Sequence, residues 1–359
     1  MPRVSSLTIN GFKSIRSLRD FKLNPLNVLI GANGAGKSNF IGFFRLLNQM
    51  YEQRLQNYVL TQGGPDALLH FGRKTTSRIH AEFYFQKNGY KFDLVPTVDN
   101  RLVYELEESW FGGVYYESTS SAILGTGHIE SKLKEAGDPY SPYVRSSVSN
   151  WRVYHFHDTG ETARVKQAHA ANINLRLETD AGNLAAYLTL LHQKHPQQYR
   201  RIVETIRLVA PFFGDFVHRD DAEFVELEWT QAGRPDTPFK AHMLSDGTLR
   251  FICLATLLLQ PTSKLPDTIL IDEPELGLHP YAISVLADMF KQVAEQRQLI
   301  VSTQSVELVN ELAPEDIVVV DQEDGASTFK RYSEEELAGW LQEYSLGEIW
   351  KRNILGGRP

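Results

Sequence analysis

The stretch "GANGAGKS", Gly31 to Ser38, decides the fold. It has the spacing G-x-x-x-x-G-K-[ST] and lies between "NVLIG", which is typical of a buried strand, and "SNFIGFFRLLNQM", which has helical spacing of apolar residues. In this context backbone N–H groups close around a polyphosphate, Lys37 reaches the β- and γ-phosphates, and Ser38 offers its hydroxyl to Mg²⁺. The alternative is a glycine-rich turn with a chance lysine, which the flanking strand and helix disfavour.

A second motif, "TILIDEPELGLHP" from Thr268 to Pro280, is an apolar strand with two carboxylates at its end. Asp272 is placed to hold Mg²⁺ through water, and Glu273 is placed to orient the attacking water as a general base. Two acidic residues after a strand usually mark only a solvated loop. The phosphate loop upstream favours the functional interpretation, and an intact Glu273 indicates that hydrolysis is open to the chain.

A third apolar strand, "QLIVSTQS", ends at Gln304. A polar side chain at this place in a phosphoryl-transfer site senses the γ-phosphate and positions water, and glutamine does so by hydrogen bonding alone. The alternative is that the "STQS" stretch only caps a helix.

The segment "LSDGTLRF" has the features of a second anion site at a helix start. Ser245 is a suitable N-cap, and Gly247 permits close backbone approach to the positive end of the helix dipole. Asp246 has the wrong charge for this task, so we expect Arg250, four residues on, to neutralise it partly. Because Gly31 to Ser38 already holds a phosphate chain, the ligand of the second site is predicted to come from another copy bound head to tail. A capped core helix without a ligand is the alternative.

Composition places the chain among globular proteins. It has 359 residues, 42% of them hydrophobic, and a formal charge of −7, so two lobes are expected and no global positive field attracts nucleic acid. The single cysteine, Cys253, excludes a disulfide scaffold and fits a reducing compartment. The longest apolar stretch, Phe251 to Leu259, is too short to span a bilayer, and "MPRVSSLTIN" is not a signal segment. We expect a cytoplasmic protein with no membrane contact.

The chain divides into segments of different character. Residues from about 78 to 107 read as antiparallel strands separated by turns, and helices alternate with short apolar strands after Lys240, which indicates a parallel sheet. We therefore predict a composite core from residues 1–107 and 241–335, an inserted and partly helical lobe at 108–240, and a C-terminal amphipathic segment at 336–359.

In their order along the chain, the phosphate loop, "LSDGT", "ILIDEPELGLHP" and "IVSTQS" resemble the ABC-type ATPases of the RecF and SMC branch, in particular the short bacterial AAA-family ATPases without a coiled coil or nuclease domain. "LTINGFKSI", "HFGRKT", "VYHFHDT" and "WLQEYSLGEIWKRNILGGRP" extend the resemblance over nearly the whole chain. It implies an α/β P-loop NTPase with a mixed sheet, an antiparallel β subdomain and an inserted helical lobe, and ATP and Mg²⁺ as cofactors.

The resemblance also assigns roles to residues. Gly31 to Ser38 is the Walker A loop, Leu244 to Thr248 is the signature read by the other copy, and Glu275 to His279 crosses the dimer interface. Gln304 stands where many such proteins have histidine, and Asp246 replaces the first signature glycine. The expected catalytic residues are Lys37, Glu273 and Gln304; the metal ligands are Ser38 and Asp272; and the nucleotide contacts are Asn33, Gly34, Ala35, Gly36, Lys37, Ser38, Asn39, Lys13, Ser14, Ser245, Asp246, Gly247 and Thr248.

The stretch "YHFHD" contains three metal-ligand types. His155 and His157 point to one side of a strand and could bind metal together with Asp158, but no further ligand has suitable spacing. A structural or nucleotide-proximal role is favoured, and His157 or Asp158 could replace the glutamine that such ATPases carry in the loop connecting their lobes.

The leading function is an ATPase that dimerises around two Mg-ATP and controls a separate effector, such as a nuclease or toxin, or a DNA transaction. By analogy, anti-phage defence or DNA repair is the setting. The alternative is a nucleotide-gated interaction module with incidental hydrolysis, in which Trp340, Leu341, Tyr344 and Trp350 form a docking surface rather than pack on the core.

Direct DNA binding has the weakest support. Basic residues form two small clusters, and solvated helix faces are the default for such clusters in an acidic chain. The clusters are Arg73, Lys74 and Arg78, and Arg200, Arg201 and Arg207.

Overall fold

The computed structural model describes residues 3–112, 120–219 and 221–358. A six-stranded sheet lies at its centre. The strands of this sheet are β3 (Leu26–Ile30), β8 (Trp151–Tyr154), β14 (Thr268–Asp272), β15 (Gln298–Thr303), β16 (Ile317–Glu323) and β17 (Ala326–Arg331). Their order is β17-β16-β3-β15-β14-β8, and every neighbouring pair is parallel except β16 with β17. The mixed sheet predicted from the sequence is confirmed.

The parallel register brings the sequence motifs to one edge of the central sheet. Thr303 lies beside Ile30, and Asp272 lies beside Ser302. The Walker A loop follows β3, the two carboxylates end β14, and Gln304 follows β15. Ligands of such sheets bind outside the carboxyl ends of the strands, so this edge is the expected place for the nucleotide.

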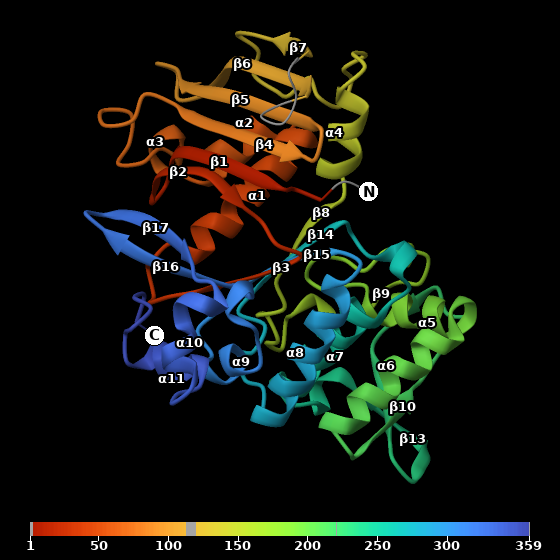
Figure 1. Cartoon of the computed structure of the whole chain (residues 1–359). Coiled ribbons are helices and arrows are strands. Elements are labelled where there is room, and N and C mark those ends of the chain that lie inside the picture. Colours follow the sequence, from red (N-terminus) through yellow and green to blue (C-terminus); the bar gives the residue numbers. More distant parts are fainter. Residues whose placement is uncertain (1–2, 113–119, 220, 359) are drawn as a thin grey trace.

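A second, antiparallel sheet covers one side of the molecule (Figure 1). Its strands are β1 (Ser6–Phe12), β2 (Ile15–Lys22), β4 (Ile79–Phe85), β5 (Asn88–Pro96), β6 (Leu102–Phe111) and β7 (Ser120–Gly125). The order is β2-β1-β4-β5-β6-β7. The antiparallel strands predicted between residues 78 and 107 are therefore present, and β7 extends them.

Helix α1 (Lys37–Tyr51) lies between the two sheets. It buries Phe40, Phe43 and Phe44 completely, and Phe43 stacks on Phe83 of the antiparallel sheet at 6.1 Å between ring centroids. The apolar residues of "SNFIGFFRLLNQM" pack on both the central sheet and the antiparallel sheet, because α1 lies between them. Burying several aromatic side chains fixes the helix that presents Lys37 and Ser38.

Alternate residues of the central strands face two different hydrophobic cores. Leu270 and Ile300 pack with α1 and the antiparallel sheet, whereas Ile269, Ile271 and Val301 pack with the helices on the other face. A sheet covered on both faces needs apolar residues at consecutive positions, which is why "TILI" and "LIV" show no polar alternation.

The helices on that other face are α5 (Leu184–Lys194), α6 (Pro196–Val209), α7 (Asp246–Leu259), α8 (Pro280–Ala294) and α9 (Val306–Asn310) (Figure 1). Three short helices pack instead with α1 and the antiparallel sheet: α2 (Leu55–Thr61), α3 (Pro65–Leu68) and α4 (Ser141–Val148). The small strands are β9 (His169–Ala170), β10 (Phe213–Phe216), β11 (Phe224–Val225), β12 (Glu228–Gln231) and β13 (Arg234–Lys240).

The segment 108–240 contributes strands to both large sheets: β7 extends the antiparallel sheet beside β6. Its strand β8 pairs with β14, with Tyr154 beside Ile271, and so forms an edge of the central sheet. The domain boundaries given above stay a prediction.

The C-terminal segment packs on the core. It forms α10 (Glu334–Leu341) and α11 (Leu346–Lys351), and Trp350 is completely buried with its indole N–H donating to Gly357 O at 2.6 Å. Trp340 stays 44% exposed. Of the two alternatives, packing is confirmed for Trp350. None of the helices in the described ranges is long and apolar enough to cross a membrane.

Candidate nucleotide-binding site

The Walker A loop is held in a phosphate-binding shape by its lysine. The Lys37 ammonium is buried and donates to Gly31 O at 2.6 Å and Ala32 O at 3.0 Å. An ammonium has three N–H donors, so one remains for a phosphate oxygen. The hydroxyl of Ser38 is on an exposed residue next to it, and Asn33 and Gly34 are also exposed.

Two glycines of the loop are required by close contacts. Gly31 has φ of +152° and Gly36 has φ of +115°. A Cβ on Gly31 would overlap the carbonyl of Val320, and a Cβ on Gly36 would overlap the Ser327 hydroxyl. These positions therefore accept only glycine, and the second observation shows that β17 approaches the loop.

Ser14 connects the antiparallel sheet to the Walker A loop. Its hydroxyl accepts from Asn39 Nδ2 at 2.7 Å and lies 2.7 Å from the Ser327 hydroxyl, which donates its one proton to Ala35 O at 2.6 Å. The expected proximity of Ser14 to the loop is thus seen in the geometry. Ser327 was not expected, because it lies almost three hundred residues away in the sequence.

Lys13 and Ser14 line an open cavity beside the loop. His70, Phe71 and Gly325 line the same cavity. Lys13 has φ of +47°, and its ammonium donates to Gln62 Oε1 at 3.2 Å. Burial lowers the pKa of Lys13, and nearby Arg45 lowers it further. Phe71 is 65% exposed, so its ring is accessible to a planar ligand.

The first Walker B carboxylate is oriented by the neighbouring strand. The Ser302 hydroxyl, which is fully buried, donates to Asp272 Oδ1. The other carboxylate oxygen has no protein partner in the hydrogen bonds of the described residues. Asp272 thus has the arrangement of a carboxylate that keeps one oxygen for a metal or its water.

The second carboxylate, Glu273, is held by the predicted Gln304. Gln304 Nε2 donates to Glu273 Oε1 at 2.5 Å. Glu273 has φ of +43°, which is uncommon for a residue other than glycine, and its N–H donates to Ser302 O at 2.9 Å. The backbone turn separates the directions of Asp272 and Glu273 and leaves the second oxygen of Glu273 for water.

Glu275 is a polar anchor of the same loop. Its Oε1 accepts from the Thr303 hydroxyl at 2.5 Å and from the Gln304 N–H at 3.0 Å. Its Oε2 is buried without a hydrogen-bond partner among the described residues. Burial is the largest influence and raises the pKa of Glu275, Glu273 raises it further, and the hydrogen bonds from Thr303 and Gln304 oppose the rise.

Lys37 lies in the field of all three carboxylates. Burial lowers the pKa of Lys37, and Glu273, Asp272 and Glu275 act in the opposite direction. Cation and carboxylates from two distant motifs are thereby brought into one site. The carboxylates therefore favour the charged form of Lys37, which is the form that binds phosphate, and burial opposes it.

The signature segment is exposed and capped. The Ser245 hydroxyl accepts from the Thr248 N–H at 3.2 Å as the N-cap of α7. Ser245 and Asp246 are exposed, and Gly247 and Thr248 are half-buried. The tip of α7 is therefore accessible to a second molecule.

Gly247 and Arg250 join the signature helix to neighbouring loops. A Cβ on Gly247 would overlap Gly277 O. The Arg250 guanidinium is buried and donates to Phe156 O at 3.0 Å, to His157 O at 3.2 Å, and to the carbonyl of Leu276.

Two cations act on Asp246. Its carboxylate lies 3.7 Å from Lys166 Nζ, a residue of the 108–240 segment that the sequence did not single out. Burial lowers the pKa of Arg250 and the charge of Asp246 acts in the opposite direction, so the expected charge interaction between these two residues is present. It is not a direct ion pair, because backbone carbonyls accept from the Arg250 guanidinium.

The "YHFHD" stretch ends next to the Walker B motif. His157 lines a small pocket together with Arg250, Asp272 and Glu273. The backbone N–H of His155 donates to Thr179 O at 3.0 Å, and burial, Arg45 and His157 lower the pKa of the His155 imidazole. Within the described residues there is no group of three or more His, Cys, Asp or Glu side chains arranged to hold a metal.

The two basic clusters differ in how far their charge is balanced. In the first cluster, Arg73 pairs with Asp66 at 3.0 Å and Arg78 pairs with Glu105. In the second cluster, Arg207 donates to Gly214 O at 2.9 Å, which leaves its charge in place. DNA binding through these residues stays an untested prediction.

This arrangement of loop, strands and capped helix defines a P-loop ATPase with the fold of an SMC head. A crystal structure described as the SmcHead bound to the C-winged helix domain of ScpA superposes with a TM-score of 0.63, covering 94% of this chain and 100% of that one at 16% identity. A Smc head with an extended coiled coil, bound to the C-terminal domain of ScpA derived from Pyrococcus furiosus, gives 0.58 over 96% and 99% at 16% identity. Such low identity establishes the fold alone.

The family follows from a sequence model. The family "AAA domain, putative AbiEii toxin, Type IV TA system" matches residues 26–310, and the chain belongs to this family. No match was found among curated proteins.

The residues fit a nucleotide and a divalent cation. Lys37 keeps one N–H donor, Asp272 keeps one oxygen, and the Ser38 hydroxyl makes no hydrogen bond within the described part of the chain. Oxygen ligands of this kind suit Mg²⁺, which binds through few protein groups together with phosphates. When bound, the cation would neutralise charge that develops on the transferred phosphoryl group.

Proposed function

We propose that this protein hydrolyses Mg-ATP in a head-to-tail dimer and uses the cycle to control a partner. The single observation that carries the proposal is the contact of Gln304 Nε2 with Glu273 Oε1 at 2.5 Å, beside the Walker A lysine. A carboxylate that is oriented by a neutral amide and faces a cation is suited to position the attacking water.

Each part of the site has a task in that reaction. The N–H groups of residues 33–39, with Lys37, hold the phosphates, while Ser38 and Asp272 hold the cation. Glu273 accepts a hydrogen bond from the water and Gln304 keeps this carboxylate in place. Lys13 and Ser14 belong to the cavity beside the loop, where the base of the nucleotide would lie against Phe71.

The dimer is supported by the exposed hydrogen-bonding groups of the signature segment. The α7 tip is exposed, and in the described ranges neither Ser245 nor Thr248 bonds to the Walker A loop of its own chain. Its N-terminal N–H groups and the nearby Lys166 favour an anion. A second copy can supply that anion as the γ-phosphate of its own ATP.

Replacing Glu273 by Gln tests this proposal. The variant keeps the hydrogen-bonding shape of the side chain but removes the base, so ATP still binds and hydrolysis falls by a factor of about 10² or more. With saturating ATP and Mg²⁺, light scattering should show a trapped dimer, whereas the variant without ATP stays monomeric. Glu204→Gln, an exposed residue of α6, is the matched control and should behave as wild type.

A Glu273→Gln protein that stays monomeric at saturating Mg-ATP would contradict the dimer. A variant with undiminished phosphate release would contradict the role of Glu273. These two outcomes are separate, because the first tests the signature and the second tests the water-positioning carboxylate.

The partner is proposed to be a separate effector protein. The SMC heads that share this fold were crystallised with a domain of ScpA, and the family description names a putative toxin of a toxin–antitoxin system, which supports a defence setting over DNA repair. Cells expressing the wild type should plate phage less efficiently than cells expressing Lys37→Ala. Equal plating over a panel of phages would remove the defence role and leave the ATPase proposal intact.

The alternative function is a nucleotide-gated interaction module. It is favoured by the partly exposed Trp340, which lies 6.2 Å from Tyr344 between ring centroids on the C-terminal segment. If the wild-type protein dimerises with ATP but its turnover number equals that of Glu273→Gln, this alternative is favoured over the ATPase cycle.

A further inference from the structure

A cavity of about 290 Å³ lies beside the edge strand β8, away from the Walker and signature motifs. Its wall combines β8, the segment 175–177, the turn 263–267 that leads into β14, and the residue before β15. None of these residues belongs to the nucleotide site described above. The cavity therefore has a separate entrance and its own chemistry.

The lining of this cavity is strongly basic. Arg152, Arg176, Lys264 and Arg297 contribute four positive charges, against one carboxylate from Asp267. The whole chain has a formal charge of −7, so the excess is local and not a background property of the protein. Cations gathered around a concave surface raise the local concentration of anions.

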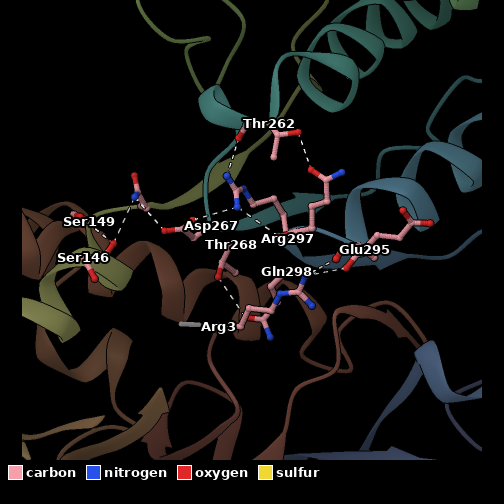
Figure 2. A network of polar contacts seen from close by, with 12 residues as sticks. Arg3, Ser146, Ser149, Thr262, Asp267, Thr268, Glu295, Arg297 and Gln298 are labelled. Atoms are coloured by element: carbon pink, nitrogen blue, oxygen red, sulfur yellow. Dashed lines mark hydrogen bonds and ion pairs between the residues drawn. The ribbon is translucent and has the colours of Figure 1, made fainter. Parts of the chain in front are cut away.

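The one carboxylate in the lining, that of Asp267, already has protein partners. Asp267 is buried, accepts from Asn150 Nδ2 at 3.1 Å and lies 3.8 Å from Arg297 NH1. Figure 2 shows Arg297 between Asp267 and Thr262, whose carbonyl accepts from Arg297 NH2 at 2.7 Å. Asp267 can balance only one of the four cations, so about three positive charges remain for a ligand.

Several donors in the wall have no protein acceptor. Tyr154 is 3% exposed and lines the cavity, and within the described residues its hydroxyl makes no hydrogen bond. Arg297 Nε is buried without an acceptor, and the Arg176 guanidinium has no ion pair or hydrogen bond in the described part of the chain. The Tyr154 side chain is buried while its hydroxyl faces the cavity, so this donor is available to a ligand or to water there.

The Tyr154 hydroxyl is a donor at neutral pH. Burial raises the pKa of Tyr154 well above its ordinary range, although Arg152 and Arg176 lower it. Because the proton stays on the oxygen, the hydroxyl can donate to an anion in the cavity. Arg152 and Arg176 line the same cavity as this hydroxyl.

We propose that this cavity binds a small phosphate-bearing anion through the Tyr154 hydroxyl, the Arg176 guanidinium and the Lys264 ammonium. Phosphate oxygens accept several hydrogen bonds at once and match planar guanidinium donors. A volume near the lower end of ligand pockets fits pyrophosphate or a mononucleotide better than a polymer. The inference does not depend on ATP hydrolysis.

Calorimetric titration with inorganic pyrophosphate tests the site. The Lys37→Ala protein serves as the background, because it weakens anion binding at the Walker A loop. In that background pyrophosphate should bind with one ligand per chain. Adding Arg176→Glu and Lys264→Glu should weaken binding at least about tenfold, whereas Arg200→Glu, an exposed residue on α6, should leave it unchanged.

Tyr154→Phe provides a second variant that keeps the ring and its packing. It should weaken pyrophosphate several-fold with an unchanged unfolding temperature, because only one hydrogen bond is lost. Three outcomes would overturn the proposal: no binding in the Lys37→Ala background, binding unaffected by Arg176→Glu with Lys264→Glu, or single-stranded DNA that binds through these two residues when pyrophosphate does not.

Discussion

The Walker region and the signature region satisfy their polar groups in different ways. Lys37, Asp272 and Glu275 are bonded within the chain, to loop carbonyls, to Ser302 and to the end of β15. At the tip of α7, Ser245 and Thr248 bond to each other, Asp246 lies 3.7 Å from Lys166, and both Ser245 and Asp246 stay exposed. One half of the site is thus organised before the nucleotide binds, and the other half is complete only when something else approaches it.

The difference indicates how ATP could act as a link between copies. A preorganised cradle loses little freedom when it binds phosphate, so the binding energy of the triphosphate is available for contacts elsewhere. The exposed helix start offers such contacts. If the two regions served one molecule alone, the second would be expected to bond to the first inside the chain.

The largest effect is expected from breaking the cradle. Lys37→Ala removes the buried ammonium that Gly31 O and Ala32 O hold in place, and phosphate release should fall by about 10³-fold because transition-state charge on the phosphoryl group loses its nearest cation. A coupled phosphate assay measures this. Lys194→Ala, an exposed lysine at the end of α5, is the control; turnover by Lys37→Ala at the control's rate would mean that this loop does not bind the nucleotide.

The next effect is expected at the signature. Ser245→Ala removes a hydroxyl that could contact a charged phosphate, and such hydrogen bonds contribute about 1.5–3 kcal/mol. We expect ATP-dependent dimerisation of the Glu273→Gln protein to weaken at least about tenfold when Ser245→Ala is added, measured by analytical ultracentrifugation over a range of concentrations.

This change also removes a helix cap, which costs about 1 kcal/mol of stability. Ser333→Ala separates the two effects, because Ser333 caps α10 in the same way, with its hydroxyl accepting from Glu336 N–H at 3.2 Å. Dimerisation weakened equally by both variants would assign the loss to general destabilisation and not to the signature.

A smaller effect is expected at the cavity beside the loop. Phe71 is 65% exposed there, and stacking of a base on an aromatic ring contributes about 1–3 kcal/mol. Phe71→Ala should raise the KM for ATP about fivefold and leave kcat nearly unchanged, since the base takes no part in the chemistry. Steady-state kinetics checks this against Phe224→Ala, another exposed ring, at 61%; equal KM values would place the base elsewhere.

The sequence predicted the motif-bearing part of the fold well. Strand ends at Ile30, Asp272 and Thr303 follow from short apolar runs, and a parallel sheet places what comes after them at one edge. The antiparallel strands and α1 were also predicted, because period and turn residues are local signals. The hydrogen bond from Gln304 Nε2 to Glu273 Oε1 could not be predicted, because the spacing of the two residues along the sequence does not show that their side chains meet.

The supporting residues could not be predicted in the same way. Ser302, Ser327 and Lys166 act on the site through contacts between distant segments, and each is an ordinary residue in its own stretch. The interaction of Asp246 with Arg250 shows the same limit. Helical spacing predicts their charge interaction, but it does not predict that three backbone carbonyls accept from the Arg250 guanidinium.

The smallest effect is expected from Glu275, where the Walker region is least satisfied. Burial raises the pKa of this carboxyl, and its Oε2 has no partner within the described residues. A group whose folded-state pKa lies above the unfolded value contributes stability below the unfolded pKa, and this contribution is lost as the pH rises through the folded pKa. The charged carboxylate is therefore a cost at neutral pH.

Glu275→Gln removes that titration and keeps an oxygen that can accept from Thr303 and from the Gln304 N–H. Urea unfolding between pH 4.5 and 7.5 should show the variant gaining stability relative to wild type as the pH rises, by no more than about 1 kcal/mol at pH 7, because its new amide N–H groups lack acceptors. Glu335→Gln on the exposed face of α10 should give a difference that does not change over this range. If the difference in unfolding free energy between Glu275→Gln and wild type stays constant over this pH range, the charge of Glu275 does not affect stability. The hydrogen bonds from Thr303 and Gln304 would then hold the loop, and the Walker region would have no unsatisfied group to set against the exposed signature.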